Sequence, residues 1–360
     1  MGILKLFLTL SLLSIAPTGH ADFACSSNTT NCEALIDYVT PNATTLSKLK
    51  TFFGVKSLRS ILGVNNLPVS TSGSHAVSAQ ETVRIPFSCI CTNGTGKSNK
   101  RPIYTVVSGD SLYYIANTVF AGLVTVADIG AANQIQNVSL IVPGQKLWIP
   151  LPCSCDKVNG QTVVHYGHVV ASGSSVAQIA QEYGSTVQTL LTLNNMSDPS
   201  KLLAGQVFDV PLKACSSSVN SSSDDYPLLV GNGTYVVTAN DCVLCNCSST
   251  NNYTLDCQPS ELKPSSSKWS TCPSTLCTGS SLNIGNSTST NCNTTTCSYA
   301  GYTNQSILTA LEVTTNQTCS ASSPGSSPSN QASKIHLGGW ISALILAFIH
   351  SFVLYFQHFW

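Results

Sequence analysis

The chain has 360 residues, enough for two or three domains of ordinary size. Only 9% of the residues are charged, against about 25% in an average soluble domain, and 16 basic and 16 acidic side chains cancel to a formal net charge of zero. The chain therefore lacks the positive field that nucleic-acid binding requires. Sixteen cysteines, an even number behind an apolar N-terminal stretch, predict disulfides and an oxidising compartment.

Residues 1–21 predict a secretory signal peptide. Lys5 precedes an apolar run at 6–13, and the small residues Gly19 and Ala21 suit a cleavage site near Ala21. We therefore expect the mature chain to be secreted.

Residues 22–88 contain two short helical patterns, at 45–53 and 57–65, and end with the segment Arg84–Phe87. They have no recognisable Gly-Asp turn. We interpret them as a degenerate first copy of the pattern that follows.

Residues 103–151 predict the order strand, helix, helix, strand. Tyr104–Val107 is aromatic and β-branched, Ser108–Asp110 suits a turn and helix cap, and Pro143-Gly144 turns the chain into a strand at 146–150. Apolar residues at helical spacing mark two short helices. They are Leu112, Ile115, Ala116 and Val119 in the first helix, and Val126, Ile129 and Ala132, before Asn133, in the second.

Residues 165–213 repeat this pattern. Identical residues such as Gly109 and Gly173 lie 64 positions apart in the two copies, and the later matches, such as Asn133 with Asn194, lie 61 apart. A unit of about 48 residues is barely stable alone. The predicted fold class is therefore α+β, with three βααβ modules packed together by disulfides. Each copy ends in a proline followed within four residues by a cysteine: Cys89, Cys153 and Cys215.

The ten cysteines from Cys215 to Cys319 predict a separate cysteine-rich disulfide domain at 215–319. Its spacing Cys242-X-X-Cys245-X-Cys247 does not continue the βααβ pattern, and the pairing of its five expected bridges stays open. Zinc binding is disfavoured and no metal is expected, because histidine is sparse in the mature chain.

The C-terminal residues predict a membrane attachment. Residues 320–336 form a Ser/Pro-rich linker, and residues 337–360 are apolar without a basic cluster after them. A transmembrane helix and a glycosylphosphatidylinositol (GPI) signal are both consistent with this tail. Small residues at 326–333 followed by a polar spacer favour the GPI signal, with Asn330 as the preferred acceptor, although any acceptor within 325–333 is possible.

Asn-X-Ser/Thr sequons are spread over the whole mature chain and predict a glycosylated extracellular surface. They lie at Asn28, Asn42, Asn93, Asn137, Asn195, Asn220, Asn232, Asn246, Asn252, Asn286, Asn293, Asn304 and Asn316.

The motif Tyr-X-Val-X-X-Gly-Asp-Ser-Leu at 104–112, followed by Ile-Ala, Asn133 and Pro-Gly-Gln-X-Leu-X-Ile-Pro at 143–150, resembles the lysin motif, LysM. LysM is a βααβ module that binds polymers of N-acetylglucosamine. Three copies separated by Cys-X-Cys pairs resemble plant LysM receptor ectodomains. The signal peptide, the cysteine-rich region and the anchor tail without a kinase make the chain similar to the plant LysM GPI-anchored proteins.

The resemblance implies three disulfides, Cys25–Cys91, Cys32–Cys155 and Cys89–Cys153, and a shallow sugar groove between two loops of the middle copy. We expect one principal groove, because the third copy has Ser174 in place of Asp110 and a sequon at Asn195. Ile135 is expected to be an exposed apolar contact at a loop tip. The expected groove residues are Ser108, Gly109, Asp110, Ser111, Ala132, Asn133, Gln134, Ile135 and Gln136.

The resemblance implies a receptor on the outer face of the plasma membrane that binds chitin oligosaccharides in plant innate immunity. The expected partner is a LysM receptor-like kinase, and a ligand-induced homodimer is also possible. A peptidoglycan receptor and a non-signalling wall glycoprotein remain alternatives. An enzyme is not expected, because the carboxylates are scattered and no nucleophile motif occurs. No cofactor is expected.

Overall fold

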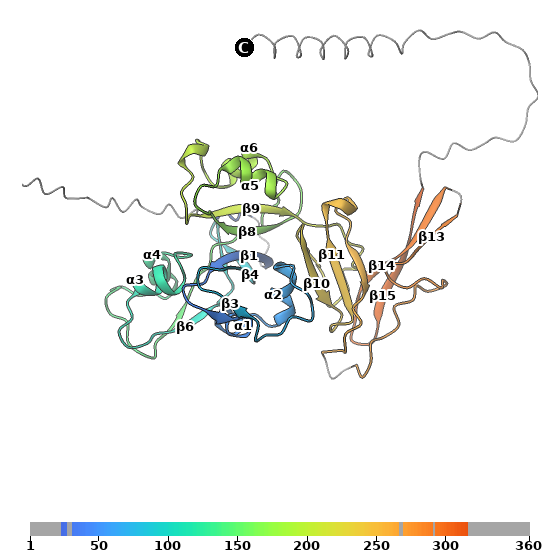
Figure 1. Ribbon diagram of the computed structural model, residues 1–360, viewed down its shortest axis with the longest axis horizontal. Helices are drawn as coiled ribbons and strands as arrows, with labels where there is room; N and C mark the ends of the chain where they lie inside the picture. Colours follow the sequence, from blue (N-terminus) through green and yellow to red (C-terminus); the bar gives the residue numbers. More distant parts are fainter. Residues whose placement is uncertain (1–22, 27–30, 266–268, 291, 316–360) are drawn as a thin grey trace, which may run out of the picture. The chain divides into compact units, whose positions relative to one another are not determined.

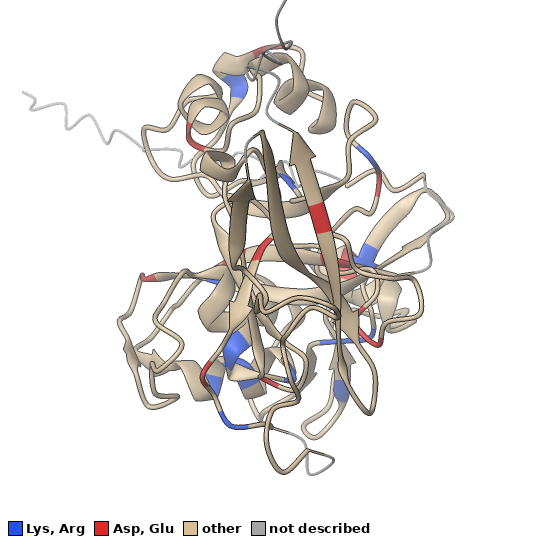
Figure 2. Ribbon diagram, turned by 90° about the vertical axis from the view of Figure 1, so that its right-hand side faces the viewer, with Lys and Arg blue, Asp and Glu red and all other residues tan. Residues whose placement is uncertain are grey.

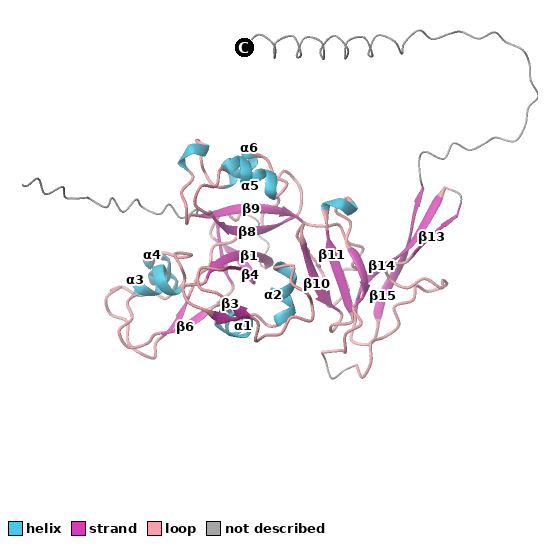
Figure 3. Ribbon diagram, viewed as in Figure 1, coloured by secondary structure: helices cyan, strands magenta, loops and turns pink. Residues whose placement is uncertain are grey.

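The computed structural model describes residues 23–26, 31–265, 269–290 and 292–315 (Figure 1). The predicted signal peptide, Cys319, the linker, Asn330, the apolar tail and the sequons at Asn28 and Asn316 lie outside these residues. Within them, no helix is long and apolar enough to cross a membrane. Short helices alternate with strands up to residue 213, and strands predominate after it (Figure 3).

A first βααβ segment spans residues 32–92. The hydroxyl of Thr45 caps its first helix and that of Ser57 caps its second, while Gly54, at φ 68°, ends the first. The two long strands pair antiparallel, with Ile36 opposite Ile85. The elements are β1 (Cys32–Val39), β2 (Thr44–Thr45), α1 (Leu46–Phe53), α2 (Leu58–Val64), β3 (Ala76–Val77) and β4 (Thr82–Thr92).

A second βααβ segment spans residues 103–148. Its first predicted helix starts as α-helix at Leu112 and continues as π-helix, and its second is capped by a reciprocal pair, Thr125 and Asp128. The predicted strand at 146–150 ends at Trp148. After β5 (Thr95–Ser98), the elements are β6 (Ile103–Thr105), α3 (Leu112–Tyr114), η1 (Ile115–Val119), α4 (Val126–Ala132) and β7 (Lys146–Trp148).

A third βααβ segment spans residues 163–213. Its first strand lies parallel to β1, with Leu35 opposite Tyr166, so the first and third segments share one five-stranded sheet in the order β5-β4-β1-β8-β9. The second segment keeps its own two-stranded ladder, β6–β7. The elements are β8 (Val163–Val169), α5 (Val176–Glu182), α6 (Val187–Leu193), η2 (Pro199–Lys201) and β9 (Val207–Lys213).

Residues after 213 form two three-stranded antiparallel sheets. Their hydrophobic core is built around half-cystines and Trp269. The elements are β10 (Thr234–Thr238), β11 (Val243–Cys247), η3 (Ser249–Asn251), β12 (Asp256–Pro259), β13 (Ser287–Thr290), β14 (Asn293–Tyr302) and β15 (Ile307–Thr315). Four disulfides staple this part: Cys215–Cys247, Cys242–Cys272, Cys245–Cys257 and Cys277–Cys297.

Two further disulfides join the N-terminal residues to the ends of the first two segments, and a third joins those two ends to each other. The structure contains Cys25–Cys91, Cys32–Cys155 and Cys89–Cys153, the pairs that the resemblance implies. They lie against one another, since the backbone N of Cys155 is 3.1 Å from Sγ of Cys25. Buried side chains of the first and second segments form one continuous core, whereas the third segment has a core of its own.

Candidate functional site

The turn between β6 and α3 contains four of the predicted groove residues. Gly109 has φ 94°, a conformation that favours glycine, and open space where a Cβ would be. Asp110 Oδ2 accepts hydrogen bonds from the Val107 N–H at 2.7 Å and the Tyr104 hydroxyl at 2.8 Å, and Ser111 Oγ caps α3. Burial and the Asp110 hydrogen bond raise the pKa of Tyr104 to about 12. Asp110 and Ser111 therefore hold the turn, and the Asp110 N–H also donates to the Val107 carbonyl at 3.1 Å. Ser108 and Gly109 are the turn residues left available to a ligand.

Asn133 ends α4 and is engaged by the fold on both sides of its amide. Its Nδ2 donates to the carbonyls of Ile129, at 2.8 Å, and Trp148, at 2.7 Å, and its Oδ1 accepts from the Trp148 N–H at 2.8 Å. These three bonds tie the second helix to the last strand. The side chain of Asn133 has a structural role here.

The same helix ending occurs three times. In each βααβ segment an asparagine bonds both backbone groups of one strand residue, the next residue has φ between 50° and 55°, and an apolar residue then donates its N–H back into the helix. The three series are Asn65 with Arg84, then Asn66 and Leu67; Asn133 with Trp148, then Gln134 and Ile135; and Asn194 with Asp209, then Asn195 and Met196.

This ending changes the interpretation of Ile135. The side chain is half-buried and packs against the core, as the apolar residue after such a helix ending commonly does. The expectation of an exposed loop tip was wrong in that respect, because the hydrophobic contact that closes the helix requires an apolar residue there. A ligand contact by Ile135 stays a prediction.

The structure does not bring all predicted groove residues to one place. Asn133 bonds to Trp148 at one end of the β6–β7 ladder, whereas Val106 pairs with Gly144 and Gln145 at the other end, beside the Ser108–Ser111 turn. Trp148 lies three residue steps along the strand from Gln145, a distance of about 10 Å. The turn therefore lies next to the later part of the α4–β7 loop. Ala132, Asn133, Gln134 and Gln136 belong to the earlier part.

That later part of the loop carries exposed apolar side chains that the sequence analysis missed. Leu140 is 70% exposed and Val142 is 61% exposed, and Val107 at the turn is 60% exposed. We call Val107, Leu140 and Val142 the apolar rim. The available signal was Val-Ser-Leu-Ile-Val at 138–142, an apolar run between turn residues without a helix or strand to bury it.

Comparison with known proteins identifies the family to which this architecture belongs. The family model for the LysM domain matches residues 104–150 and 168–211. The chain is 48% identical over 335 residues to LysM domain-containing GPI-anchored protein 2 of Arabidopsis thaliana, covering 92% of this chain and 90% of that protein. It is 43% identical over 321 residues to the chitin elicitor-binding protein of Oryza sativa subsp. japonica, covering 88% of each. The chain belongs to the plant LysM GPI-anchored proteins.

Neither of these two relatives is named as an enzyme. The crystal structure of the ectodomain of a receptor-like kinase also aligns, with 22% identity and a TM-score of 0.43, over 51% of this chain and 93% of that ectodomain. Few charged residues occur on the ribbon of this chain, and they are scattered (Figure 2).

The two matched LysM domains differ at the rim. Positions equivalent to Val107, Leu140 and Val142 are Ala171, Lys201 and Leu203 in the third segment, which is therefore less apolar. The sequons do not distinguish the two domains, because Asn137 is exposed in the loop after α4 just as Asn195 is exposed in the equivalent loop of the third segment. The apolar rim, not glycosylation, distinguishes the second segment.

Two histidines of β8 bond to aspartates, one within the third segment and one on β1 of the first segment. His165 Nδ1 lies 2.9 Å from the Asp209 carboxylate and Nε2 lies 2.8 Å from the Asp156 carbonyl. His168 Nδ1 lies 2.9 Å from Asp37 on β1. Burial by itself lowers the pKa of His165, but Asp209 and the Asp156 carbonyl outweigh it and raise the pKa. Both rings serve the fold, since each lies against an aspartate from another strand.

Proposed function

We propose that this protein binds chitin oligosaccharides at the cell surface as a pattern-recognition receptor. The observation that carries the proposal is the apolar rim beside the Gly109 turn. Chitin is uncharged, so its recognition needs backbone hydrogen-bonding groups for the amide and hydroxyls, and apolar surface for the acetyl methyl and the sugar face. A relative named chitin elicitor-binding protein, 43% identical, supports the same ligand.

The binding site proposed here comprises the Ser108–Ser111 turn with Leu140 and Val142. Of the sequence-predicted residues, Ser108 and Gly109 are its central members, and Ala132, Gln134, Ile135 and Gln136 extend it toward the end of α4. Asp110 and Asn133 position its backbone. The third segment contributes little, because a lysine replaces Leu140 there.

We also propose that the chain contains three LysM modules, at 22–88, 103–151 and 165–213, followed by a cysteine-rich domain at 215–319. The repeated asparagine ending in all three segments supports the count. The first module has no Gly-Asp turn, and its α2 is covered by β10: a Cβ on Gly63 would lie 2.1 Å from the Tyr235 carbonyl. That packing makes the first module a scaffold.

The mature protein is proposed to be GPI-anchored through Asn330 at the outer face of the plasma membrane, after removal of residues 337–360. The names of its relatives support the anchor. Phosphatidylinositol-specific phospholipase C should release the protein from plant membranes. Retention in the membrane fraction, while an anchored control protein is released, would point to a transmembrane tail.

A lipid-anchored receptor needs a spanning partner, and a LysM receptor-like kinase is proposed for that role. Long oligomers present acetamido groups on both faces, so two copies can bind one chain and gain effective concentration. Chitin octamers should therefore dimerise the protein in light scattering and promote kinase association, whereas trimers should only occupy the site. Equal dimerisation by both ligands contradicts this model.

The test of ligand choice is retention of the full chain on chitin beads beside insoluble peptidoglycan, since both polymers contain N-acetylglucosamine. Retention by chitin and release by free chitin octamer is the expected result. Binding to peptidoglycan alone would identify peptidoglycan, not chitin, as the ligand. Binding to neither polymer would favour the non-signalling wall glycoprotein.

A further inference from the structure

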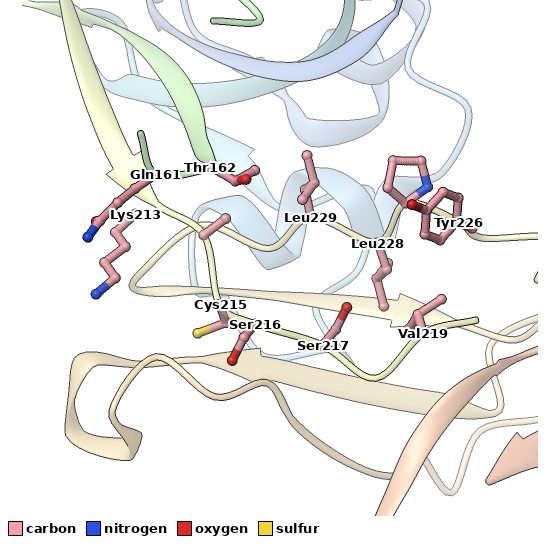
Figure 4. Close-up of a pocket in the computed structure, with 12 residues that line it drawn as sticks. Gln161, Thr162, Lys213, Cys215, Ser216, Ser217, Val219, Tyr226, Leu228 and Leu229 are labelled. Carbon is pink, nitrogen blue, oxygen red and sulfur yellow. The ribbon is translucent and has the colours of Figure 1, made fainter. Parts of the chain in front are cut away.

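A cavity of about 390 Å³ lies outside the proposed groove, where the chain leaves β9 (Figure 4). One wall comes from the start of β8 and the end of β9, with Gln161, Thr162 and Lys213. The other comes from the segments 215–219 and 226–229. None of these residues belongs to the apolar rim.

The walls of this cavity are fixed without a ligand. Cys215 is bonded to Cys247, and its N–H donates to the Val230 carbonyl at 3.0 Å. The Ala214 N–H donates to Thr162, and the Ser216 N–H donates to Tyr253. A cavity held by a disulfide and backbone bonds is preorganised, so a ligand does not have to order it.

The cavity combines an apolar floor with unengaged polar side chains. Val219, Leu228 and Leu229 pack against the neighbouring cores. Around them, the side chains of Gln161, Thr162, Ser217 and Tyr226 have no hydrogen-bond partner among the described residues, and the Tyr226 ring is 54% exposed.

Its lining is almost uncharged. Lys213 is the single charged lining residue, and its Nζ lies 3.9 Å from the centroid of the Tyr253 ring, where a cation–π contact engages it. A neutral ligand is therefore favoured over an anion. The amide and hydroxyl of Gln161 and Thr162 lie at one end of the pocket and the exposed ring of Tyr226 at the other (Figure 4). Both kinds of group match a sugar, which has a rim of hydroxyls and an apolar face.

We propose that this cavity is a second carbohydrate site, which takes one or two units of a neutral sugar. Its volume lies at the lower end of the range of about 300–1,000 Å³ for small-molecule sites, so the pocket itself has room for one or two sugar units. The site does not depend on the proposed chitin groove, and either can exist without the other.

The test uses the full chain with Leu140→Asp, so that groove binding does not mask the cavity. N-acetylglucosamine disaccharide, cellobiose and mannobiose are titrated separately, with calorimetry and saturation-transfer NMR as readouts. At least one sugar should bind saturably. Ser217→Tyr, which fills the cavity from an exposed position, should weaken that binding by about tenfold or more.

Two matched variants separate binding from folding. Ser221→Tyr places the same side chain on a nearby exposed serine outside the cavity and should leave binding unchanged. Thr162→Val removes a hydroxyl at constant shape and should weaken binding without lowering Tm. The proposal is overturned if no sugar binds, if Ser217→Tyr and Ser221→Tyr behave alike, or if binding appears only after enzymatic removal of the N-glycans, which would identify the protein's own glycan as the occupant.

Discussion

The second and third segments share a fold but are attached to the molecule differently. Cys153 and Cys155, just after β7, bind the second segment covalently to Cys89 and Cys32. Among the described residues the third segment has no disulfide to the first; Cys215, just after β9, is bonded instead to Cys247 in the C-terminal part. Pairing of β8 with β1 and Asp37, which accepts from the Tyr166 hydroxyl at 2.6 Å, hold the third segment to the first. The β6–β7 ladder belongs to no larger sheet, whereas one edge of β8 pairs with β1. The segment whose strands pair with no other segment is the one with the apolar rim.

The largest expected effect comes from cutting the covalent attachment. Replacing Cys89 and Cys153 with Ser should lower the free energy of unfolding by about 2–5 kcal/mol and reduce secretion, because the disulfide limits the conformational entropy of the unfolded chain. Denaturant unfolding of the purified protein measures the loss. The control is replacement of Cys245 and Cys257 with Ser. Their disulfide closes a short loop in the C-terminal sheets, so its loss should lower the free energy of unfolding less. Normal secretion and stability of the first variant would contradict the attachment model.

Removing the asparagine ending should affect both segments equally. Asn133→Ala and Asn194→Ala each delete three hydrogen bonds, so each should cost about 2–3 kcal/mol. Thermal unfolding measures the loss. A stable Asn133→Ala variant that fails to bind chitin would instead make Asn133 a ligand contact.

The two segments should differ in their contribution to chitin binding, although the asparagine substitutions should affect their stability equally. Leu140→Asp places a carboxylate in the apolar rim and should weaken chitin octamer binding by about tenfold or more, because the charge must be desolvated against the sugar. Leu203→Asp changes the equivalent loop of the third segment and should alter affinity less than about twofold. Calorimetry on both variants measures this difference, and comparable losses would contradict a single principal groove.

The smallest expected effect is a pH dependence confined to the third segment. The pKa of His165 is raised in the folded protein, so its stabilisation is complete below the ordinary value of about 6.5 and is lost as pH rises through the folded pKa. Amide hydrogen exchange, corrected for its intrinsic pH dependence, should show opening of β8 and β9 on that rise. His165→Gln should remove the dependence, and an equal response in β6 and β7 would contradict the assignment.

Local structure was largely predictable from the sequence because its determinants are local. Turn residues, caps and apolar spacing placed α4 and its end at Asn133. The pairing of β1 with β8 was not predictable, since strands about 130 residues apart carry no local record of their partner. The C-terminal disulfides were also left unpaired, because cysteine spacing allows many connectivities.

The candidate site was harder to predict than the fold. Ile135 was given too much weight as an exposed ligand contact, because an apolar residue in a loop can either face a ligand or pack against the core. Its packing after the end of α4 is visible only in three dimensions. Leu140 and Val142 were overlooked because the exposure of a side chain depends on which other parts of the fold cover it. The described residues leave most of both side chains uncovered.

The position of β1 in the sheet has a consequence for biosynthesis. Cys32 must wait for Cys155, and β1 must wait for β8, so the first strand of the chain cannot be completed until more than 120 later residues have been translocated. During that interval Cys25 and Cys32 are close in sequence to one another and far from their partners. If Cys25 and Cys32 pair with each other during that interval, thiol–disulfide exchange must reverse the bond, so we expect the yield of correctly paired protein to depend on disulfide isomerase activity.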